Sequence, residues 1–279
     1  MKRICDLHTH SYYSDGTCAP AELIQLAEKA ELSAIALCDH NTVAGLAEFM
    51  AAAQESDVEA VTGIEFSTEY RGTELHILGL FLENRHYGAV ESLLKEALER
   101  KKQSNMCLLE KLKEQGLAVD YESVRAEAGG TVNRAVIGAW LVRHGCCSSM
   151  EEAFDNWLSL ERGLYVPPKR PDAFETIQFI KSIGAAAVLA HPFLNLDEAQ
   201  LREFLKQAVG LDGMEVYYSK FSPEQTALAE KIAAEFGLAC SGGSDFHGSN
   251  KPDISIGKGR GNLAVPLIGL EELKKRIGR

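Results

Sequence analysis

The sequence has no apolar run long enough to cross a lipid bilayer, so it predicts no transmembrane segment. Its N-terminus reaches two histidines within ten residues, which is not the pattern of a cleavable signal peptide. The seven cysteines include no Cys-x-x-Cys pair, and their odd number fits no complete disulfide framework. We therefore expect a cytoplasmic protein with reduced, mostly buried thiols.

Positive charge is scarce as well. The 29 lysines and arginines are outnumbered by 40 aspartates and glutamates, which gives a formal net charge of −11. A surface this acidic argues against a broad basic face that holds long nucleic acid. It leaves room for a small phosphorylated substrate in a locally positive pocket. The hydrophobic content of 46% is typical of a soluble globular protein.

Two histidines follow the first apolar run of the chain. His8 and His10 come just after the run at 4–7, and side chains two apart on an extended segment point to the same side. Asp15 offers a carboxylate in the following loop. Taken alone, these residues are equally compatible with exposed loop positions. The metal-ligand interpretation gains weight because other histidines and acids also end apolar runs.

Apolar runs and amphipathic segments alternate every ~25 to 30 residues over the first 80 positions, as in parallel strands joined by crossover helices. We predict strands at 4–7, 34–38, 58–64 and 74–80 and helices at 20–31 and 42–55. The same alternation returns after position 171, with strands at 185–190, 213–217 and 238–243 and helices at 172–183, 196–208, 223–236 and 270–277.

The alternation is interrupted between about positions 84 and 170, where the sequence predicts no buried strand. A long amphipathic helix at 91–115 precedes shorter helices at 121–128, 133–144 and 149–158. This segment is too long for a simple strand-to-helix connection. We expect a barrel domain at 1–83 and 171–279, and a helical insertion at 84–170 that covers the active site.

Seven predicted strands in this order indicate a closed or nearly closed α/β barrel. In such barrels the functional residues gather at the carboxyl ends of the strands. Here His76 lies early in its strand, which the local sequence does not explain. The other five groups of candidate residues follow the ends of strands: His8 with His10, His40, Glu65, His191, and Asp245 with His247.

A mixed set of imidazoles and carboxylates suits Mn, Fe or Zn better than Ca or Mg. Each residue alone has an ordinary alternative, such as an N-cap for Asp245. No Gly-x-Ser-x-Gly or other nucleophile signature is present, so metal-activated water is the expected nucleophile. The set is too large for one ion and predicts two or three divalent ions, with the ligands His8, His10, Asp15, His40, Glu65, His76, His191, Asp245 and His247.

The motifs around these residues are His8-Thr-His10, Ser14-Asp15-Gly16, Cys38-Asp39-His40-Asn41, Gly63-Ile64-Glu65, His76-Ile-Leu-Gly79, Ala190-His191-Pro192 and Gly243-Ser244-Asp245-Phe246-His247. Together they resemble the motifs of the PHP (polymerase and histidinol phosphatase) superfamily. The resemblance implies a distorted, TIM-like (β/α)7 barrel with a trinuclear metal centre.

The resemblance also implies how the ligands are shared. One ion would be held by His8, His10, Glu65 and Asp245. Glu65 would bridge to a second ion held by His76 and His191, and Asp15, His40 and His247 would hold the third. Asp39 would orient its neighbours. We expect Glu65, Asp245 and His191 to take a direct part in catalysis.

The insertion resembles that of phosphoesterases acting on nucleoside 3′,5′-bisphosphates and short 5′-phosphorylated oligonucleotides. Those relatives usually carry an Arg-x-His-like motif, and the corresponding segment here, 130–134, lacks the histidine. Arg134 is a candidate phosphate ligand, because a guanidinium binds phosphate through two parallel hydrogen bonds. Its alternative is an ordinary surface position on a helix. Further candidates for substrate binding are Lys169, Arg170 and Asn195.

We therefore expect a metal-dependent phosphoesterase that hydrolyses small phosphomonoesters, above all the 3′-phosphate of nucleoside 3′,5′-bisphosphates. Its expected partners are nucleotide-like substrates and short oligonucleotides, with no membrane and no long nucleic acid. Three alternatives stay open: a histidinol-phosphate phosphatase, a 5′–3′ exonuclease on short oligoribonucleotides, and a non-catalytic metal-binding module.

Overall fold

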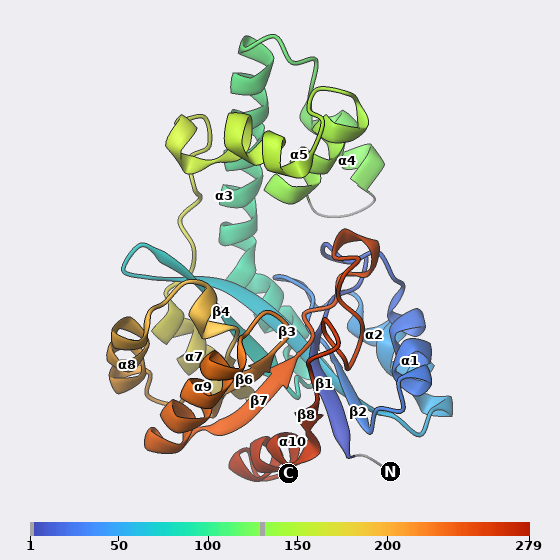
Figure 1. Cartoon of the computed structure of the whole chain (residues 1–279), viewed down its shortest axis with the longest axis vertical. Coiled ribbons are helices and arrows are strands. Elements are labelled where there is room, and N and C mark those ends of the chain that lie inside the picture. Colours follow the sequence, from blue (N-terminus) through green and yellow to red (C-terminus); the bar gives the residue numbers. More distant parts are fainter. Residues whose placement is uncertain (1–2, 129–131) are drawn as a thin grey trace. The chain divides into compact units, whose positions relative to one another are not determined.

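The computed structural model describes residues 3–128 and 132–279 (Figure 1). The chain divides into two compact units. The barrel unit consists of Met1–Glu91 and Pro171–Arg279, and the helical unit of Ser92–Arg170. Across the described residues, no helix combines the length and the apolar character that a membrane span requires.

The barrel unit is built on one eight-stranded sheet with the order β7-β6-β5-β4-β3-β2-β1-β8. The amide of Asp245 donates to the carbonyl of His8 at 2.9 Å, and the amide of His10 donates to the carbonyl of Phe246 at 3.0 Å. These bonds join the ends of β1 and β7 and nearly close the sheet, which confirms the predicted α/β barrel. The strands are β1 (Ile4–Thr9), β2 (Ala34–Leu37), β3 (Glu59–Tyr70), β4 (Thr73–Leu80), β5 (Ala186–Leu189), β6 (Gly213–Tyr218), β7 (Ala239–Gly243) and β8 (Val265–Pro266).

The eighth strand is one more than the sequence predicts. β8 pairs antiparallel with β1, at Ile4 and Cys5. It has two residues, and Pro266 cannot donate a hydrogen bond to the sheet. A segment this short has no alternation of apolar and polar residues, so nothing in the sequence marks it as a strand.

β4 runs antiparallel to both β3 and β5, whereas the alternation of segments predicts a parallel strand. Arg71 and Gly72, with φ angles of 50° and 80°, join β3 to β4 in a tight hairpin, a connection that cannot join parallel strands. The prediction that β3 ends at Glu65 is wrong for the same reason, because the strand continues to Tyr70 and pairs with β4. An antiparallel β4 begins where the parallel strands end, which explains the early position of His76.

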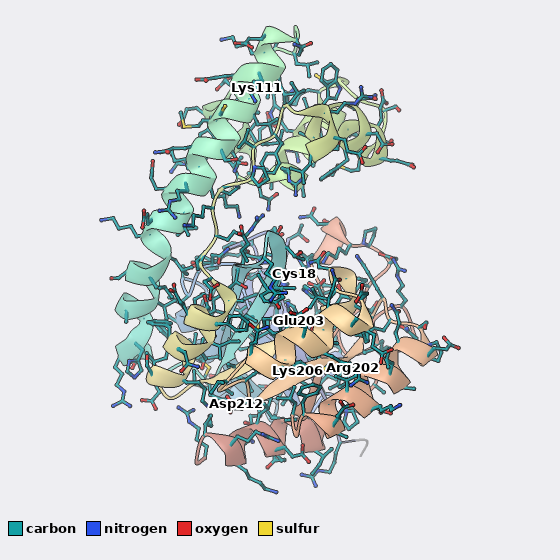
Figure 2. All side chains as sticks on the ribbon, turned by 90° about the vertical axis from the view of Figure 1, so that its left-hand side faces the viewer. Cys18, Lys111, Arg202, Glu203, Lys206 and Asp212 are labelled. Atoms are coloured by element: carbon teal, nitrogen blue, oxygen red, sulfur yellow. The ribbon has the colours of Figure 1, made fainter. Side chains whose placement is uncertain are left out.

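The described part of the barrel unit has six α-helices: α1 (Pro20–Lys29), α2 (Leu46–Ala52), α7 (Ala173–Ser182), α8 (Glu198–Gln207), α9 (Pro223–Glu235) and α10 (Leu267–Arg276). α8 is typical of their amphipathic packing. Leu201 and Phe204 are buried, while Glu203 and Lys206 are exposed on its outer face (Figure 2). Asp197 caps this helix by accepting a hydrogen bond from the amide of Gln200 at 2.8 Å.

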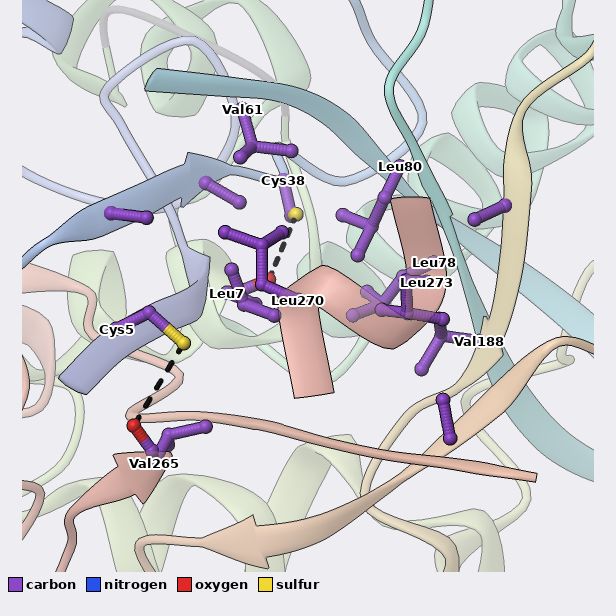
Figure 3. Close-up of a cluster of buried hydrophobic side chains, with 14 of the residues drawn as sticks. Cys5, Leu7, Cys38, Val61, Leu78, Leu80, Val188, Val265, Leu270 and Leu273 are labelled. Atoms are coloured by element: carbon purple, nitrogen blue, oxygen red, sulfur yellow. Dashed lines mark hydrogen bonds between the residues drawn. The ribbon is translucent and has the colours of Figure 1, made fainter. Parts of the chain in front are cut away.

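A cluster of mostly aliphatic side chains and thiols from the strands, from residues next to the strands and from α10 forms a core of the barrel unit (Figure 3). The thiol of Cys38 donates to the carbonyl of Leu7 at 3.4 Å, and that of Cys5 donates to the carbonyl of Val265 at 3.8 Å. Burial raises the pKa of both thiols well above the ordinary value, so neither is a reactive nucleophile. All seven cysteines are free.

The helical unit contains no strand in its described residues, 92–128 and 132–170. Its core includes Leu108, Leu112, Ile137 and Leu141. Lys111 of the long helix (Figure 2) donates hydrogen bonds to the carbonyls of Gly163 and Leu164 at 3.3 and 3.0 Å, and so connects the last segment of the unit to this helix. The helices are α3 (Tyr87–Glu114), which begins in the barrel unit, α4 (Tyr121–Ala128), α5 (Arg134–Arg143) and α6 (Met150–Ala153), followed by a π-helical turn at Phe154–Leu158.

Candidate metal centre

All nine predicted ligands converge at the edge of the sheet where the parallel strands end. Glu65 lies within β3 and forms an isolated parallel bridge with His40, which follows β2. His76 joins them from the start of β4. The remaining members come from β1 and the loops that follow β1, β5 and β7: His8, His10, Asp15, His191, Asp245 and His247.

Glu65 lies at the centre of this group and is fully buried. A single carboxylate surrounded by histidines is a suitable bridge between metal ions. Five imidazole nitrogens lie within 3.3 Å of its two oxygens: Nδ1 of His76 (2.6 Å) and Nε2 of His191 (3.0 Å) near Oε1, and Nε2 of His8 (3.1 Å), Nδ1 of His40 (3.1 Å) and Nε2 of His10 (3.3 Å) near Oε2.

Two aspartates complete the cluster on the side of His10 and His247. Oδ1 of Asp245 lies 3.3 Å from Nε2 of His10 and 3.4 Å from Nδ1 of His247. Oδ1 of Asp15 lies 3.2 Å from Nε2 of His247 and 3.8 Å from Nδ1 of His10. The rings of His10 and His247 are in contact, with centroids 4.1 Å apart. Both carboxylates therefore face nitrogen atoms that can share an ion with them.

These side chains form four overlapping groups, in each of which one potential ligand atom per residue lies within 4.8 Å of the others. Several residues belong to two groups, so the arrangement suits neighbouring ions that share ligands. The groups are His10, Asp15, His40 and His247; His8, Glu65 and His191; His8, His10 and Asp245; and His40, Glu65 and His76.

Several buried atoms of the cluster make no hydrogen bond to any described residue. They are Nε2 of His8, both ring nitrogens of His10, Nδ1 of His40 and Oε2 of Glu65. Buried polar atoms in folded proteins nearly always have a partner. Nitrogen and oxygen atoms that approach to 3.1–3.3 Å without bonding to one another fit ligands that point at a common ion. The donor set suits divalent Mn, Fe or Zn.

The backbone is strained at two of these residues. His191 and Asp245 have φ angles of 26° and 56°, and such values cost a non-glycine residue on the order of 1–3 kcal/mol. Hydrogen bonds fix both positions: the amide of His191 donates to Oε2 of Glu215 at 2.7 Å, and the amide of Asp245 donates to the carbonyl of His8. Strain of this kind is typical of functional sites.

The charges of the cluster shift its pKa values. Burial disfavours the carboxylate of Glu65, but His40, His8 and His76 outweigh it and hold its pKa well below the ordinary value. Burial acts against a charged His76, yet Glu65 raises the pKa of its imidazole to about 10. Burial lowers the pKa of His40 to about 3. Imidazoles bind metals without their proton, so metal ions and protons compete for these nitrogens.

Glu215 of β6 supports two of the histidines, although the sequence pattern did not lead us to it. Its fully buried carboxylate accepts a hydrogen bond from Nδ1 of His8 at 3.0 Å through Oε1, and from the amide of His191 through Oε2. The sequence does contain an indication of this role, because Glu215 is a charged residue within an otherwise apolar strand, Gly-Met-Glu-Val-Tyr-Tyr. Such a residue is rarely buried without partners.

Tyr218 and Lys251 hold Asp245 from outside the cluster, and neither is among the predicted site residues. Oδ2 of Asp245 accepts hydrogen bonds from the hydroxyl of Tyr218 at 2.8 Å and from Nζ of Lys251 at 2.6 Å. Its other oxygen, Oδ1, faces His10 and His247. One oxygen of Asp245 is therefore held by Tyr218 and Lys251, and the other is directed toward the cluster.

Two further buried aspartates fix the loops that carry the ligands. Asp39 accepts hydrogen bonds from the amide and hydroxyl of Ser11 at 2.8 and 2.6 Å, and from the hydroxyl of Ser14 at 2.6 Å. Asp6 accepts one from the amide of Ser244 at 2.8 Å. These contacts orient the loops after β1 and β7.

Of the four candidate substrate ligands, the structure places Asn195 beside the cluster. Its Nδ2 donates to the carbonyl of Glu74 at 2.9 Å. The carboxylate of Glu74 in turn lies 3.3 Å from Nε2 of His76. Asn195 is exposed at this edge of the barrel.

The other three candidates belong to the helical unit. The guanidinium of Arg134 lies 4.3 Å from the ring centre of Tyr165, and Nη1 donates to the carbonyl of Leu158 at 3.4 Å. Lys169 is exposed and Arg170 is half-buried at the end of the unit. Residues 130 and 131, in the segment that precedes Arg134, lie outside the described residues.

Comparison with known proteins connects this geometry to a family. Residues 6–165 match the family model of the PHP domain. The chain is 34% identical over 250 residues to a 5′-3′ exoribonuclease of Haemophilus influenzae, covering 88% of this chain and 91% of that protein. It is 28% identical over 262 residues to a 3′,5′-nucleoside bisphosphate phosphatase of Chromobacterium violaceum, covering 90% of each.

The fold agrees with these similarities. A crystal structure from Bifidobacterium adolescentis, of a protein assigned to the metal-dependent phosphoesterases, aligns with a TM-score of 0.86 at 27% identity over 99% of both chains. The family model covers more than half of this chain, and the alignment with the exoribonuclease covers 88% of it. The chain therefore belongs to the PHP family and is a metal-dependent phosphoesterase.

Proposed function

We propose that the enzyme hydrolyses the bond between phosphorus and the 3′ oxygen of 5′-phosphorylated nucleotides. Nucleoside 3′,5′-bisphosphates and short oligoribonucleotides both contain this bond. The observation that carries the proposal is Glu65, fully buried and within 3.3 Å of five imidazole nitrogens, at a site of the kind that activates water for attack on phosphorus.

The two relatives support a single bond-breaking step. In a 3′,5′-bisphosphate the attacked phosphorus carries only free oxygens, and in an oligoribonucleotide it carries the next nucleoside. In both cases water adds to phosphorus, the bond to the 3′ oxygen breaks, and that oxygen takes up a proton. The products are a nucleoside 5′-monophosphate and either inorganic phosphate, from the bisphosphate, or a shortened 5′-phosphorylated chain, from the oligoribonucleotide. A phosphatase and a 5′-3′ exoribonuclease can thus share one site.

We further propose that the cluster holds two to three divalent ions, Mn, Fe or Zn. One ion would be held by His8, His10, Glu65 and Asp245, a second by His76 and His191 with Glu65 shared between the two, and a third by Asp15, His40 and His247. When bound, such ions lower the pKa of water and stabilise negative charge on phosphate oxygens. Three ions of +2 with three carboxylates leave a local charge of roughly +3, which attracts phosphate to an acidic chain.

The protein's own residues have two tasks in this proposal. Glu65, Asp245 and His191 hold the reacting centre. The amide of His191 donates to Glu215, and Asp245 accepts hydrogen bonds from Tyr218 and Lys251, so these contacts fix the positions of His191 and Asp245. The second task is to bind the remaining phosphate and orient the nucleotide. Its candidates are Asn195, beside the cluster, and Arg134, Lys169 and Arg170 of the helical unit.

The first experiment is phosphate release from adenosine 3′,5′-bisphosphate by the manganese-loaded enzyme, with histidinol phosphate as the comparison substrate. We expect inorganic phosphate and adenosine 5′-monophosphate from the former and little release from the latter. A 5′-phosphorylated RNA 5-mer should yield the 5′-monophosphate and successively shorter products.

A matched pair of variants links the activity to the cluster. Glu65→Gln removes the central charge and should abolish turnover of both nucleotides. Glu69→Gln changes a carboxylate of the same strand outside the cluster and should keep it. Release from histidinol phosphate alone would contradict the nucleotide specificity. Metal binding without turnover of any substrate would favour a non-catalytic module.

A further inference from the structure

The helical unit contains a pocket of its own. It lies between α3 and α4, with a volume of about 320 Å³, which is within the ordinary range for a small-ligand site. Its lining includes three basic side chains, one acid, one aromatic ring and one exposed leucine: Lys101, Lys102, Arg125, Glu99, Tyr121 and Leu98.

The charge of the chain is distributed unevenly, and this pocket lies in the less acidic part. The helical unit has 12 lysines and arginines against 11 aspartates and glutamates, a net charge of +1. The barrel unit has 17 against 29, a net charge of −12. The side chains that line the pocket carry three positive charges and one negative charge, and the carboxylate of Glu122 lies beside Arg125. A polyanion therefore meets less repulsion here than at the average surface of this protein.

The pocket also offers an aromatic face. The ring of Tyr121 is partly exposed, and Nζ of Lys102 lies 6.0 Å from its centre. Nη1 of Arg125 lies 3.8 Å from the carboxylate of Glu122, and both are exposed, so this ion pair is weak and exchangeable. An aromatic ring beside basic side chains is the combination with which proteins bind single-stranded nucleic acid: the ring stacks on a base and the cations bind phosphates.

We infer that this pocket is a second nucleotide-binding subsite, which stacks a base on Tyr121 and binds phosphates through Lys102 and Arg125 when the substrate is an oligoribonucleotide. The inference rests on the proposed function, because a mononucleotide substrate has no second nucleotide to place there. The subsite also distinguishes the two substrate types. Binding at a site outside the metal centre raises the affinity for the oligonucleotide and not that for the bisphosphate.

The test measures binding without catalysis. The full chain is titrated, in the presence of a chelator that prevents cleavage, into a fluorescently labelled 5′-phosphorylated RNA 5-mer. We expect the double variant Lys102→Ala/Arg125→Ala to bind at least tenfold more weakly than wild type. Because two phosphate contacts are lost, the slope of log affinity against log salt should become shallower by about 1.4.

Two controls separate a subsite from general effects. The variant Lys95→Ala/Lys113→Ala removes the same charge from exposed positions of α3 outside the pocket, and should bind the 5-mer within twofold of wild type. Tyr121→Phe keeps the stacking ring and should retain binding, whereas Tyr121→Leu should weaken it. In the manganese-loaded enzyme, the ratio of kcat/KM for the 5-mer to that for the bisphosphate should fall in the pocket variant.

Each result has a definite meaning. Wild type that fails to bind the 5-mer, or equal binding by wild type and the pocket variant, would overturn the subsite, and so would equal losses in the pocket variant and its charge-matched control. Failure of the proposed function is a different result: the loaded wild type would hydrolyse neither nucleotide, even if it bound the 5-mer through this pocket.

Discussion

Glu215 accepts a hydrogen bond from Nδ1 of His8 at 3.0 Å, and neither side chain is accessible to solvent. A carboxylate oxygen can only accept, so Nδ1 carries the proton and Nε2 is the nitrogen left for a metal. Nε2 lies 3.1 Å from Glu65 at the centre of the cluster. Glu215 thus sets both the tautomer and the orientation of a predicted ligand.

Replacing this carboxylate should weaken metal binding without removing a ligand. We expect Glu215→Gln to lower the affinity for Mn²⁺ by about 10- to 100-fold, the range typical of groups that orient a ligating histidine. Isothermal titration of the metal-free protein measures this directly. Glu55→Gln, at an exposed position on the barrel unit, is the matched control and should leave the affinity unchanged. Unchanged affinity in Glu215→Gln would contradict the role.

Asp245 should depend on its two external donors in a similar way. Tyr218→Phe removes the hydroxyl that donates to Oδ2, and Lys251→Met removes the ammonium. We expect each variant to lower metal affinity and kcat about tenfold, and the double variant to lose more, because the carboxylate is then free to rotate. Lys251→Arg should restore part of the affinity. If all of these variants bind metal as wild type does, the hydrogen bonds from Tyr218 and Lys251 do not contribute to metal binding by Asp245.

Metal removal should lower thermal stability. Ions that bind only the folded state, at a hundredfold excess over Kd, stabilise by about 2.7 kcal/mol per site. For a unit of this size, that amount corresponds to a decrease in Tm of roughly 5–10 °C per site on chelation. The decrease should reverse when Mn²⁺ is returned. Glu65→Gln should respond much less, and a variant that responds like wild type would exclude Glu65 as a ligand.

Gly243 permits the close approach of β7 to β1 at the metal centre. A Cβ atom there would lie 2.4 Å from Cβ of His8 and 2.5 Å from its backbone nitrogen. We expect Gly243→Ala to destabilise by about 1–3 kcal/mol or more, and to displace His8. Gly88→Ala, whose Cβ would meet no atom within 4 Å in helix α3, should be neutral or slightly stabilising. Thermal unfolding and metal titration of both variants test this, and equal stability would contradict it.

Most of the barrel was predictable because its signals are local. Short apolar runs and amphipathic segments of fixed period mark strands and helices, and helices such as 121–128 and 223–236 were found within a residue or two of their ends. The direction of β4 was not predictable in the same way. It depends on the continuation of β3 past Glu65 to the hairpin at Arg71 and Gly72, and the apolar run that marks the strand in the sequence ends before that continuation.

The sequence by itself determined the fold class, the family resemblance and the set of imidazoles and carboxylates, because each of these is visible in residue types and short motifs. Tertiary structure alone decided which of them face one another and which residues support them. Glu215 and His8 are 207 positions apart, and no local pattern connects them. The two residues meet because β6 and β1 belong to one barrel, and the barrel is a property of the folded chain as a whole.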